Sequence, residues 1–426
     1  MKKTLLFFIV LTFITLSASA QRKLIYCGTL IDGVSKSVRN NVTIIVEKNK
    51  IVQIADNIMP PQSGDEVIDL SKKTVMPGLI DMHVHLETET SKDAPTKRMS
   101  MSAADIAFEA EKNGRTNLMA GFTTVRDLGG TGVNISLRNA INKGIVVGPR
   151  IFTSGRTIAT TGGHGDPTNG WRDDINFAPH VTDGVINSPD EARQAIRQRY
   201  KDGTDWIKIT ATGGVLSIAK SNKAPQFQKD ELDALIATAK DYGFKVAAHA
   251  HGAEGIKRAL RAGVTTIEHG SFLDDECIAL FKEKGAYLVP TIIAGKSAAD
   301  SAKIPGYYHP LVVPKALEVG PLIQKSFERA YKAGVKIAFG TDAGVYKHGL
   351  NAKEFQYMTE AGMPIMEAIK SATIVAAEVL EMKDQLGSIE VGKLADIIAT
   401  ETNPLNDVTT MMNVTFVMRD GVVYKK

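Results

Sequence analysis

The chain has 426 residues, of which 43% are hydrophobic and 23% are charged, and its formal net charge is +4. This composition is typical of a soluble globular protein with a large core, and the length allows one large domain and a smaller one. Because the sequence contains no basic block and no basic–aromatic stripe, we expect no nucleic-acid partner.

The first twenty residues predict a secretory signal peptide. Lys2-Lys3 precede a nearly continuous apolar run at 5–16, and residues 18–20 form a small-residue cleavage site. A retained anchor is the alternative, but the run is too short to cross a bilayer, so we expect export to a bacterial periplasm without stable membrane insertion. The two cysteines, Cys27 and Cys277, could form one disulfide, although two buried thiols are the simpler interpretation.

Both ends of the remaining chain are rich in β-forming residues. Short strand-like runs lie at 24–27, 42–46, 51–54 and 67–70, and again at 396–399, 414–418 and 422–424. Because an isolated small sheet is marginally stable, we expect the two ends to pair into one β-sandwich domain, residues 21–75 plus 386–426. Two unrelated flanking pieces are the alternative.

The middle of the chain, residues 76–385, alternates strand-like and helix-like runs. The candidate strands lie at 79–85, 123–127, 150–154, 206–210, 245–249, 264–269, 287–290 and 336–342. Eight such units predict an α/β fold, a (β/α)8 TIM-type barrel, with an open doubly wound sheet as the alternative. Polar residues at the ends of several strands favour the barrel, because catalytic groups in barrels gather at the C-terminal ends of the strands.

A pair of histidines, His83 and His85, ends the first of these strands. Side chains alternate faces along a strand, so both imidazoles point the same way and form half of a metal site. The later strands end in or carry further candidate ligands, which are Lys208, His249, His269 and Asp342. Four imidazoles and a carboxylate at one end of a barrel suit a divalent metal such as zinc.

Lys208 is the unusual member of this set. An ammonium group beside metal cations is unfavourable, so a lysine buried there tends to be neutral. A neutral amine can take up CO2 to become a carbamate, an anion that bridges two metals. The alternative is a barrel lysine paired with a carboxylate.

In combination these motifs resemble the amidohydrolase superfamily over nearly the whole chain after the signal peptide. The motifs that carry the resemblance are Pro77-Gly-Leu-Ile-Asp-Met-His-Val-His85, Glu268-His-Gly270, Gly340-Thr-Asp-Ala-Gly344 and the segment 387–396. The segments 162–166, 211–215 and 289–291 are closer to the branch that holds Xaa-Pro dipeptidases and imidazolonepropionases.

The resemblance implies a binuclear metal centre and a role for each ligand. It implies that His83, His85 and Asp342 bind the more buried metal, that His249 and His269 bind the second, and that N-carboxylated Lys208 bridges both. A hydroxide between the metals would be the nucleophile. Asp342 would act as general base and then pass its proton to the leaving amine.

Substrate contacts are expected from His164, His251 and the loop around Phe227. His164 lies in a glycine-rich loop, where it can assist the second metal in polarising the substrate carbonyl, and His251 shares the strand face of His249. A free substrate carboxylate needs a cation or a hydroxyl, for which Arg156, Arg172 and residues 225–228 are candidates. Dipeptidases of this branch often carry an aromatic hydroxyl near that loop, which Phe227 lacks.

The resulting hypothesis is an exported, binuclear dipeptidase that cleaves before a C-terminal proline or a related residue. Hydrolysis of a cyclic amide, as in imidazolonepropionase, or of an ester or lactone is the alternative, and export counts against the imidazolonepropionase reaction because that step is cytoplasmic. A non-catalytic metal-binding barrel is disfavoured by the intact ligand set. By resemblance we also expect a homo-oligomer.

Overall fold

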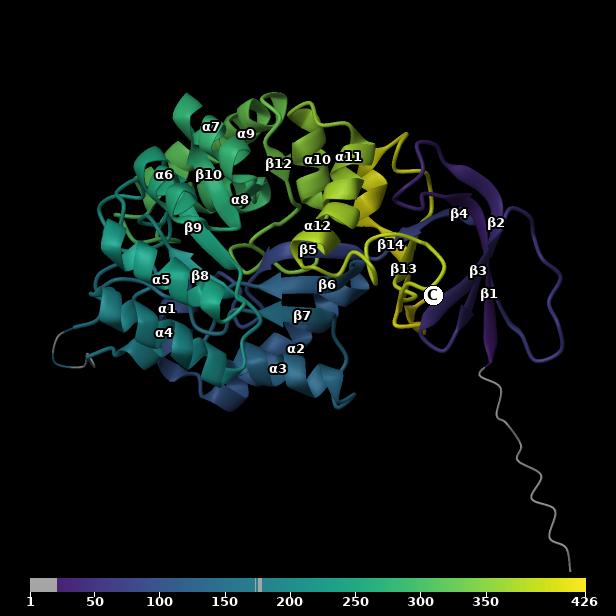
Figure 1. The fold of residues 1–426 in the computed structure, drawn as a ribbon, viewed down its shortest axis with the longest axis horizontal. Coiled ribbons are helices and arrows are strands. Elements are labelled where there is room, and N and C mark those ends of the chain that lie inside the picture. Colours follow the sequence, from purple (N-terminus) through teal and green to yellow (C-terminus); the bar gives the residue numbers. More distant parts are fainter. Residues whose placement is uncertain (1–20, 173, 175–177) are drawn as a thin grey trace, which may run out of the picture.

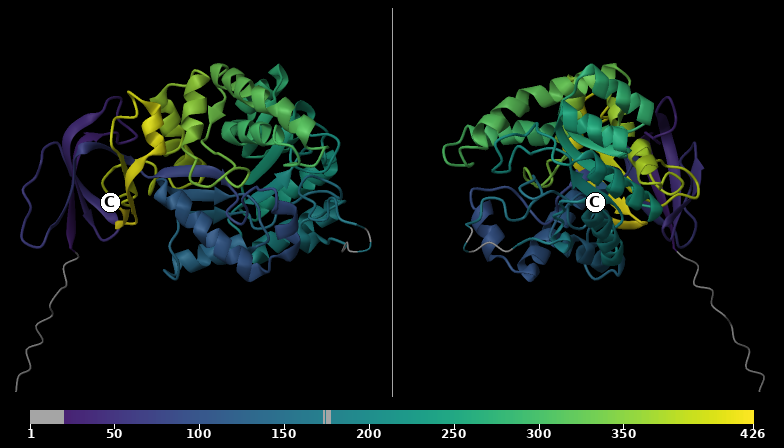
Figure 2. Two further views of the ribbon diagram at one scale, coloured as in Figure 1. Left: turned by 180° about the vertical axis from the view of Figure 1, so that it is seen from behind. Right: turned by 60° about the vertical axis from the view of Figure 1, so that its left-hand side comes forward.

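Figure 1 shows the computed structural model of the chain, which describes residues 21–172, 174 and 178–426. The predicted signal peptide at 1–20 lies outside the described residues. None of the helices in the described chain combines the length and the apolar character that crossing a membrane requires. The described residues form a helix-covered barrel with a β domain at one side (Figure 2).

Strands from both ends of the chain form the β domain. Its strands are β1 (Arg22–Leu30), β2 (Arg39–Glu47), β3 (Lys50–Ala55), β4 (Glu66–Pro77), β13 (Ile397–Thr400), β14 (Val414–Arg419) and β15 (Val422–Lys425). They pair in the order β15-β14-β13-β4-β1-β2-β3, and Met76 opposite Ile398 joins the two halves. The N–H of Ile51 in the edge strand β3 donates to the carbonyl of Lys393, before β13, so the sheet curls back on itself. The predicted pairing of the two chain ends is thereby confirmed.

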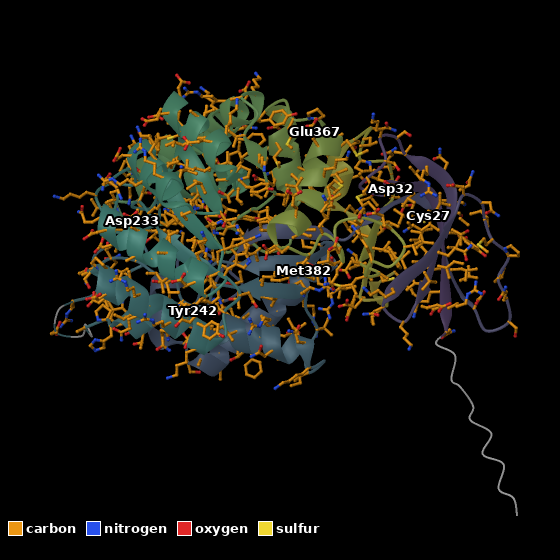
Figure 3. All side chains as sticks on the ribbon, viewed as in Figure 1. Cys27, Asp32, Asp233, Tyr242, Glu367 and Met382 are labelled. Carbon is orange, nitrogen blue, oxygen red and sulfur yellow. The ribbon has the colours of Figure 1, made fainter. Side chains whose placement is uncertain are left out.

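The β domain has a hydrophobic core of its own. Ile25 and Cys27 of β1, Ile44 of β2 and Phe416 of β14 are buried together there. Period-2 alternation explains this packing, because alternate residues of each strand point to the same face. Cys27 is labelled in Figure 3, and both it and Cys277, which is buried in the barrel's helical layer, are unpaired thiols.

Eight parallel strands form the barrel, as predicted. They are β5 (Leu79–Val84), β6 (Phe122–Asp127), β7 (Arg150–Thr153), β8 (Ile207–Thr210), β9 (Val246–Gly252), β10 (Thr266–Phe272), β11 (Tyr287–Val289) and β12 (Lys336–Ile337). β5–β7 pair as one sheet and β8–β12 as another. Bridges between Ile158 and Ile209 and between Val84 and Ala343 join the two ladders, which closes the barrel.

Helices cover the outside of the barrel. They are α1 (Ala94–Ser100), α2 (Ala103–Met119), α3 (Val133–Asn142), α4 (Pro189–Asp202), α5 (Lys229–Asp241), α6 (Ala253–Ala262), α7 (Asp275–Lys284), α8 (Ile292–Ala302), α9 (Val313–Lys332), α10 (Lys353–Glu360), α11 (Ile365–Ser371) and α12 (Ile374–Val379). Gly263 ends α6 with a φ of +106°, and Gly243 follows α5 with a φ of +74°. Glycine adopts this left-handed conformation without strain, which is why it marks helix ends in the sequence.

The barrel and the β domain are joined by a half-buried cluster of charges around Arg150. Its guanidinium group lies 2.8 Å from Asp396 and 2.6 Å from Asp420, both in the C-terminal part of the chain, and also donates to Thr124 Oγ1 at 2.9 Å. Asp396 is almost fully buried. A buried carboxylate is costly without a partner, so Arg150 ties β7 to the β domain.

We expect Arg150→Met to lower the free energy of unfolding by about 3–5 kcal/mol, because it leaves Asp396 buried and unpaired. Urea titration of the metal-free protein measures the change. The double variant Arg150→Met/Asp396→Asn is the matched control and should lose less. A loss below about 1 kcal/mol in the single variant would mean that this ion pair does not support the junction.

Candidate metal centre

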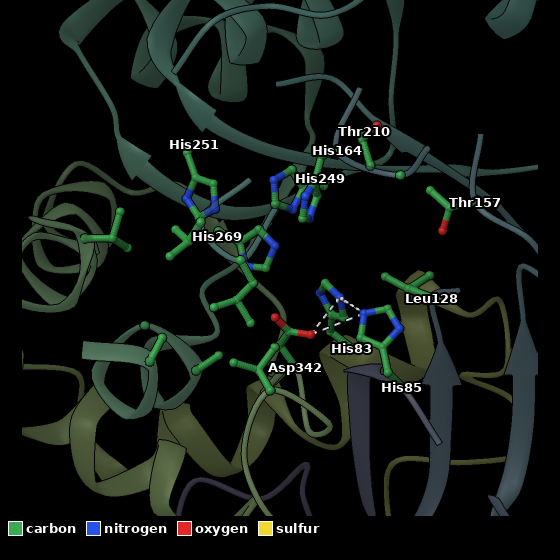
Figure 4. Close-up of a pocket in the computed structure, with 18 of the residues that line it drawn as sticks. His83, His85, Leu128, Thr157, His164, Thr210, His249, His251, His269 and Asp342 are labelled. Atoms are coloured by element: carbon green, nitrogen blue, oxygen red, sulfur yellow. Dashed lines mark hydrogen bonds and ion pairs between the residues drawn. The ribbon is translucent and has the colours of Figure 1, made fainter. Parts of the chain in front are cut away.

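His83 of β5 and His85, which directly follows this strand, lie side by side at the mouth of the barrel (Figure 4). Their Nε2 atoms are 3.3 Å apart, and His83 is almost fully buried, whereas the side chain of His85 is 26% exposed. The Nδ1 of His85 lies 3.0 Å from the carbonyl of Gly129. This contact engages one ring nitrogen and leaves Nε2 beside the Nε2 of His83.

Asp342 completes this group from the end of the last barrel strand. Its Oδ1 lies 3.3 Å from His85 Nε2 and 3.5 Å from His83 Nε2. The sequence predicts a strand over 336–342, but β12 ends at Ile337 and Asp342 has a φ of +60°. This left-handed turn, fixed by the Asp342 N–H donating to the His83 carbonyl at 2.7 Å, shortens the strand and brings the carboxylate to the imidazoles.

A second group of imidazoles comes from β9 and β10. The ring of His269 lies 4.6 Å from that of His249 and 4.8 Å from that of His251, between centroids. One nitrogen of each ring has a neutral oxygen neighbour: Thr291 Oγ1 lies 2.7 Å from His269 Nδ1, Ser271 Oγ 2.8 Å from His251 Nδ1, and the Gly213 carbonyl 3.3 Å from His249 Nε2. The remaining nitrogen of each ring is left available.

Lys208 lies in β8 beside the first group. Its Nζ is 3.4 Å from His83 Nε2, and burial lowers its pKa to about 8. A neutral amine is therefore accessible close to neutral pH, which is the form that reacts with CO2.

The pocket that these residues line has a volume of about 210 Å³. His83, His85, Lys208, His164, His249, His251, His269 and Asp342 all line it. An outer cavity of about 490 Å³ shares His85 and His164 with it. Phe227 lines neither cavity and is buried in the hydrophobic core, and neither Arg156 nor Arg172 is among the residues that line them.

His164 reaches the pocket from the loop after β7. The His164 ring lies 4.3 Å from the ring of His249, and the backbone N–H of His164 donates to Gln226 Oε1 at 2.9 Å. A Cβ at residue 214 would lie 2.2 Å from this ring, so Gly214 leaves the space that the imidazole occupies. The loop of Phe227 thus supports the site through its neighbour Gln226.

Sequence reasoning missed two residues beneath the pocket, Glu268 and Arg126. Glu268 Oε2 lies 2.9 Å from His83 Nδ1, and its Oε1 lies 3.0 Å from Arg126 Nη2. An arginine inside a predicted barrel strand was the available signal, because such a charge is buried only with a partner. Asp81 is also buried there and accepts from the N–H of His83, the hydroxyl of Thr341 and the side-chain amide of Asn351.

The donor set fits divalent metal ions. Oδ1 of Asp342 is buried and accepts no well-formed hydrogen bond from the described residues. The ligand atoms of His83, His269 and Asp342 lie within 4.8 Å of one another, as do those of His249, His251 and His269. Imidazole nitrogen and carboxylate oxygen are ligands that zinc accepts, and an ion there would satisfy the orphaned oxygen.

Residues 74–424 match the amidohydrolase family, and the chain belongs to that family. Together with the barrel and its strand-end histidines and aspartate, this match identifies a hydrolase that acts on amide and related C–N bonds.

Three relatives illustrate the similarity. The crystal structure of a Xaa-Pro dipeptidase with bound methionine in the active site is 51% identical, with a TM-score of 0.93, and the match covers 95% of this chain and 100% of that chain. A prolidase complexed with N-methylphosphonate-L-proline is 32% identical over 95% of this chain and 100% of its own, with a TM-score of 0.87. Ochratoxinase from Aspergillus niger is 32% identical over 95% of this chain and 87% of its own length.

We expect the metal-free protein to lose stability as the pH falls from about 7 to 4. Burial lowers the pKa of His83 and His164 to about 4, that of His251 to about 3, and those of His249 and His269 well below 6.5. In this window the unfolded chain takes up protons that the folded chain does not, so the free energy of unfolding rises with pH.

Urea titrations between pH 4 and 8 should show a net uptake of roughly two protons on unfolding near pH 5. The five rings take up protons, whereas Asp81, Asp127 and Glu354, whose pKa values burial raises to about 7, 6 and 8, release them. The variant His251→Asn removes one titrating ring and should take up about one proton fewer. A free energy of unfolding that does not change between pH 7 and 5 would contradict the expectation.

Proposed function

We propose that the chain is exported and hydrolyses dipeptides at a centre that binds two divalent metal ions, with zinc as the first candidate. The observation that carries the proposal is one pocket in which buried metal-binding side chains face a recess of uncharged residues. The 51% identical structure of a Xaa-Pro dipeptidase supports the same substrate class.

The ligands divide into two groups around Lys208. In the proposal His83, His85 and Asp342 hold one ion, His249 and His269 hold the other, and N-carboxylated Lys208 contacts both. When bound, the ions supply Lewis acidity, which lowers the pKa of water towards neutrality and polarises the scissile carbonyl.

Asp342 moves the proton in this proposal. Burial raises the pKa of this carboxyl group but the neighbouring His83 and His85 outweigh it, and the pKa is about 2, so the carboxylate is ionised before reaction. It takes a proton from the attacking water and then delivers it to the leaving amine. Nδ1 of His164 has no hydrogen-bond partner among the described residues, and in the proposal this neutral ring contacts the substrate oxygen.

The recess selects the leaving residue. Ala294, Gly295 and Ala298 of α8 and Val319 and Ile323 of α9 line it. A charged side chain placed against these residues would lose its hydration without gaining a partner. The proposal therefore assigns proline or another uncharged, apolar residue to the C-terminal position of the substrate.

A different amide is the second candidate substrate. Ochratoxinase is similar over most of this chain. The outer cavity, with Tyr307 and Tyr308 in its wall, has room for an acyl group larger than one amino acid. Periplasmic location and assembly into a homo-oligomer are part of the proposal and rest on the sequence alone.

Hydrolysis of a dipeptide library by the zinc-loaded enzyme, with amine release as the readout, tests the substrate. We expect kcat/KM for Xaa-Pro, Xaa-Met and Xaa-Leu to exceed that for Xaa-Arg and Xaa-Glu by at least about tenfold, the smallest effect expected from burying an unpaired charge. If the enzyme with two bound metal ions releases no amine from any dipeptide of the library, the dipeptidase proposal is rejected. Cyclic amides, esters or lactones then become the candidate substrates.

We expect Lys208→Ala to lose bound metal and activity, because the bridging carbamate is gone. Short carboxylic acids in the buffer should restore part of the bound metal and part of the activity. They should restore neither in Lys208→Arg, because the longer arginine side chain cannot form a carbamate and fills the space that the acid would occupy. Metal content by elemental analysis and kcat are the measurements. A Lys208→Ala enzyme with two metals and full activity would rule out the bridge.

A further inference from the structure

A fully buried ion pair crosses the barrel beneath the pocket. Arg126 of β6 and Glu268 of β10 are both 0% exposed, with 3.0 Å between Nη2 and Oε1. The guanidinium group also donates to the Met82 carbonyl at 2.6 Å and to Thr266 Oγ1 at 3.2 Å, and its Cζ lies 4.5 Å from the ring centroid of Trp206. These contacts to β5, to β10 and to the residue before β8 hold the guanidinium group in one orientation.

Fold stability alone does not account for this pair. Removing two charges from water is costly, and replacing a buried ion pair by uncharged residues of similar volume is often neutral or stabilising. The pair has a second connection, however. Glu268 Oε2 lies 2.9 Å from His83 Nδ1, within hydrogen-bonding distance although out of hydrogen-bond alignment, and neither atom has a hydrogen-bond partner among the described residues.

We propose that Arg126 and Glu268 are positioning residues that make His83 the strongest imidazole ligand of the site. The carboxylate accepts the Nδ1–H of His83 and so fixes the tautomer whose Nε2 lone pair is free. That Nε2 is the atom that lies 3.3 Å from the Nε2 of His85 and 3.5 Å from Oδ1 of Asp342.

Among the described residues, the engaged nitrogens of the other imidazoles face neutral oxygens. His85 Nδ1 has the Gly129 carbonyl as its neighbour, and His269 Nδ1 has the Thr291 hydroxyl. An anionic acceptor raises the basicity of a histidine ligand more than a neutral one does. The two metal positions are therefore unequal, and the ion beside His83 binds first and leaves last.

This inference rests on the proposed binuclear centre, and metal binding tests it without reference to turnover. Metal-free full-length protein is titrated with Co²⁺, followed by calorimetry and by the visible spectrum of the ion. We expect two unequal sites in the wild type. Glu268→Gln should weaken the tighter site by about 10–100-fold and leave the weaker one within about threefold.

Two further variants separate positioning from folding. Thr291→Val removes the neutral contact to His269 and should weaken only the second site, which makes it the matched control. Arg126→Met leaves Glu268 buried without its partner and should destabilise the fold, whereas Arg126→Met/Glu268→Gln should recover stability but not tight metal binding.

Each outcome is decisive. Two sites of wild-type affinity in Glu268→Gln, or recovery of tight binding in the double variant, would overturn the positioning role while leaving the binuclear centre in place. A wild-type protein that binds fewer than two ions would overturn the proposed function and this inference with it.

Discussion

The carboxylate of Asp342 is buried at the barrel mouth with one oxygen that has no hydrogen-bond partner among the described residues, and much of the surrounding structure follows from holding it there. The last strand stops early so that residue 342 can turn into the left-handed region. Gly340 keeps the chain close to β11, because a Cβ there would lie 2.3 Å from Val289. Asp81 fixes Thr341 from below. Backbone strain and packing are thus arranged around one anionic oxygen.

The imidazoles of the pocket must stay neutral if they are to face a cation. Four buried rings and the partly buried ring of His164 stay neutral near neutral pH because desolvation disfavours their charged form, so neutral imidazoles line the cavity without internal repulsion. Glu268 contributes an anion directly beneath His83, and Arg126 balances that anion. The site therefore combines neutral donors facing the cavity with a compensated charge pair behind them. Such an arrangement favours metal binding at some cost to acid stability.

The strand ends were predictable because alternation and barrel topology bring them to one rim. Predicted strands such as 79–85 and 123–127 agree with β5 and β6 within one residue, and the histidine pair faces one way for the reason given by strand geometry. The short β12 was not predictable, because a positive φ at an aspartate leaves no mark in the sequence. The resemblance predicted a substrate contact from the loop around Phe227, but this side chain packs into the hydrophobic core.

The seven-stranded sheet has a consequence for how the chain reaches this state. β1–β4 are synthesised first, but β4 pairs on its outer side with β13, near the end of the sequence. Until residues 397–425 arrive, β4 presents an unpaired strand edge, the kind of surface on which chains associate wrongly. The β domain can close only after the barrel's whole sequence has been made. Loss of residues 397–426 would therefore leave an aggregation-prone edge on an otherwise complete barrel.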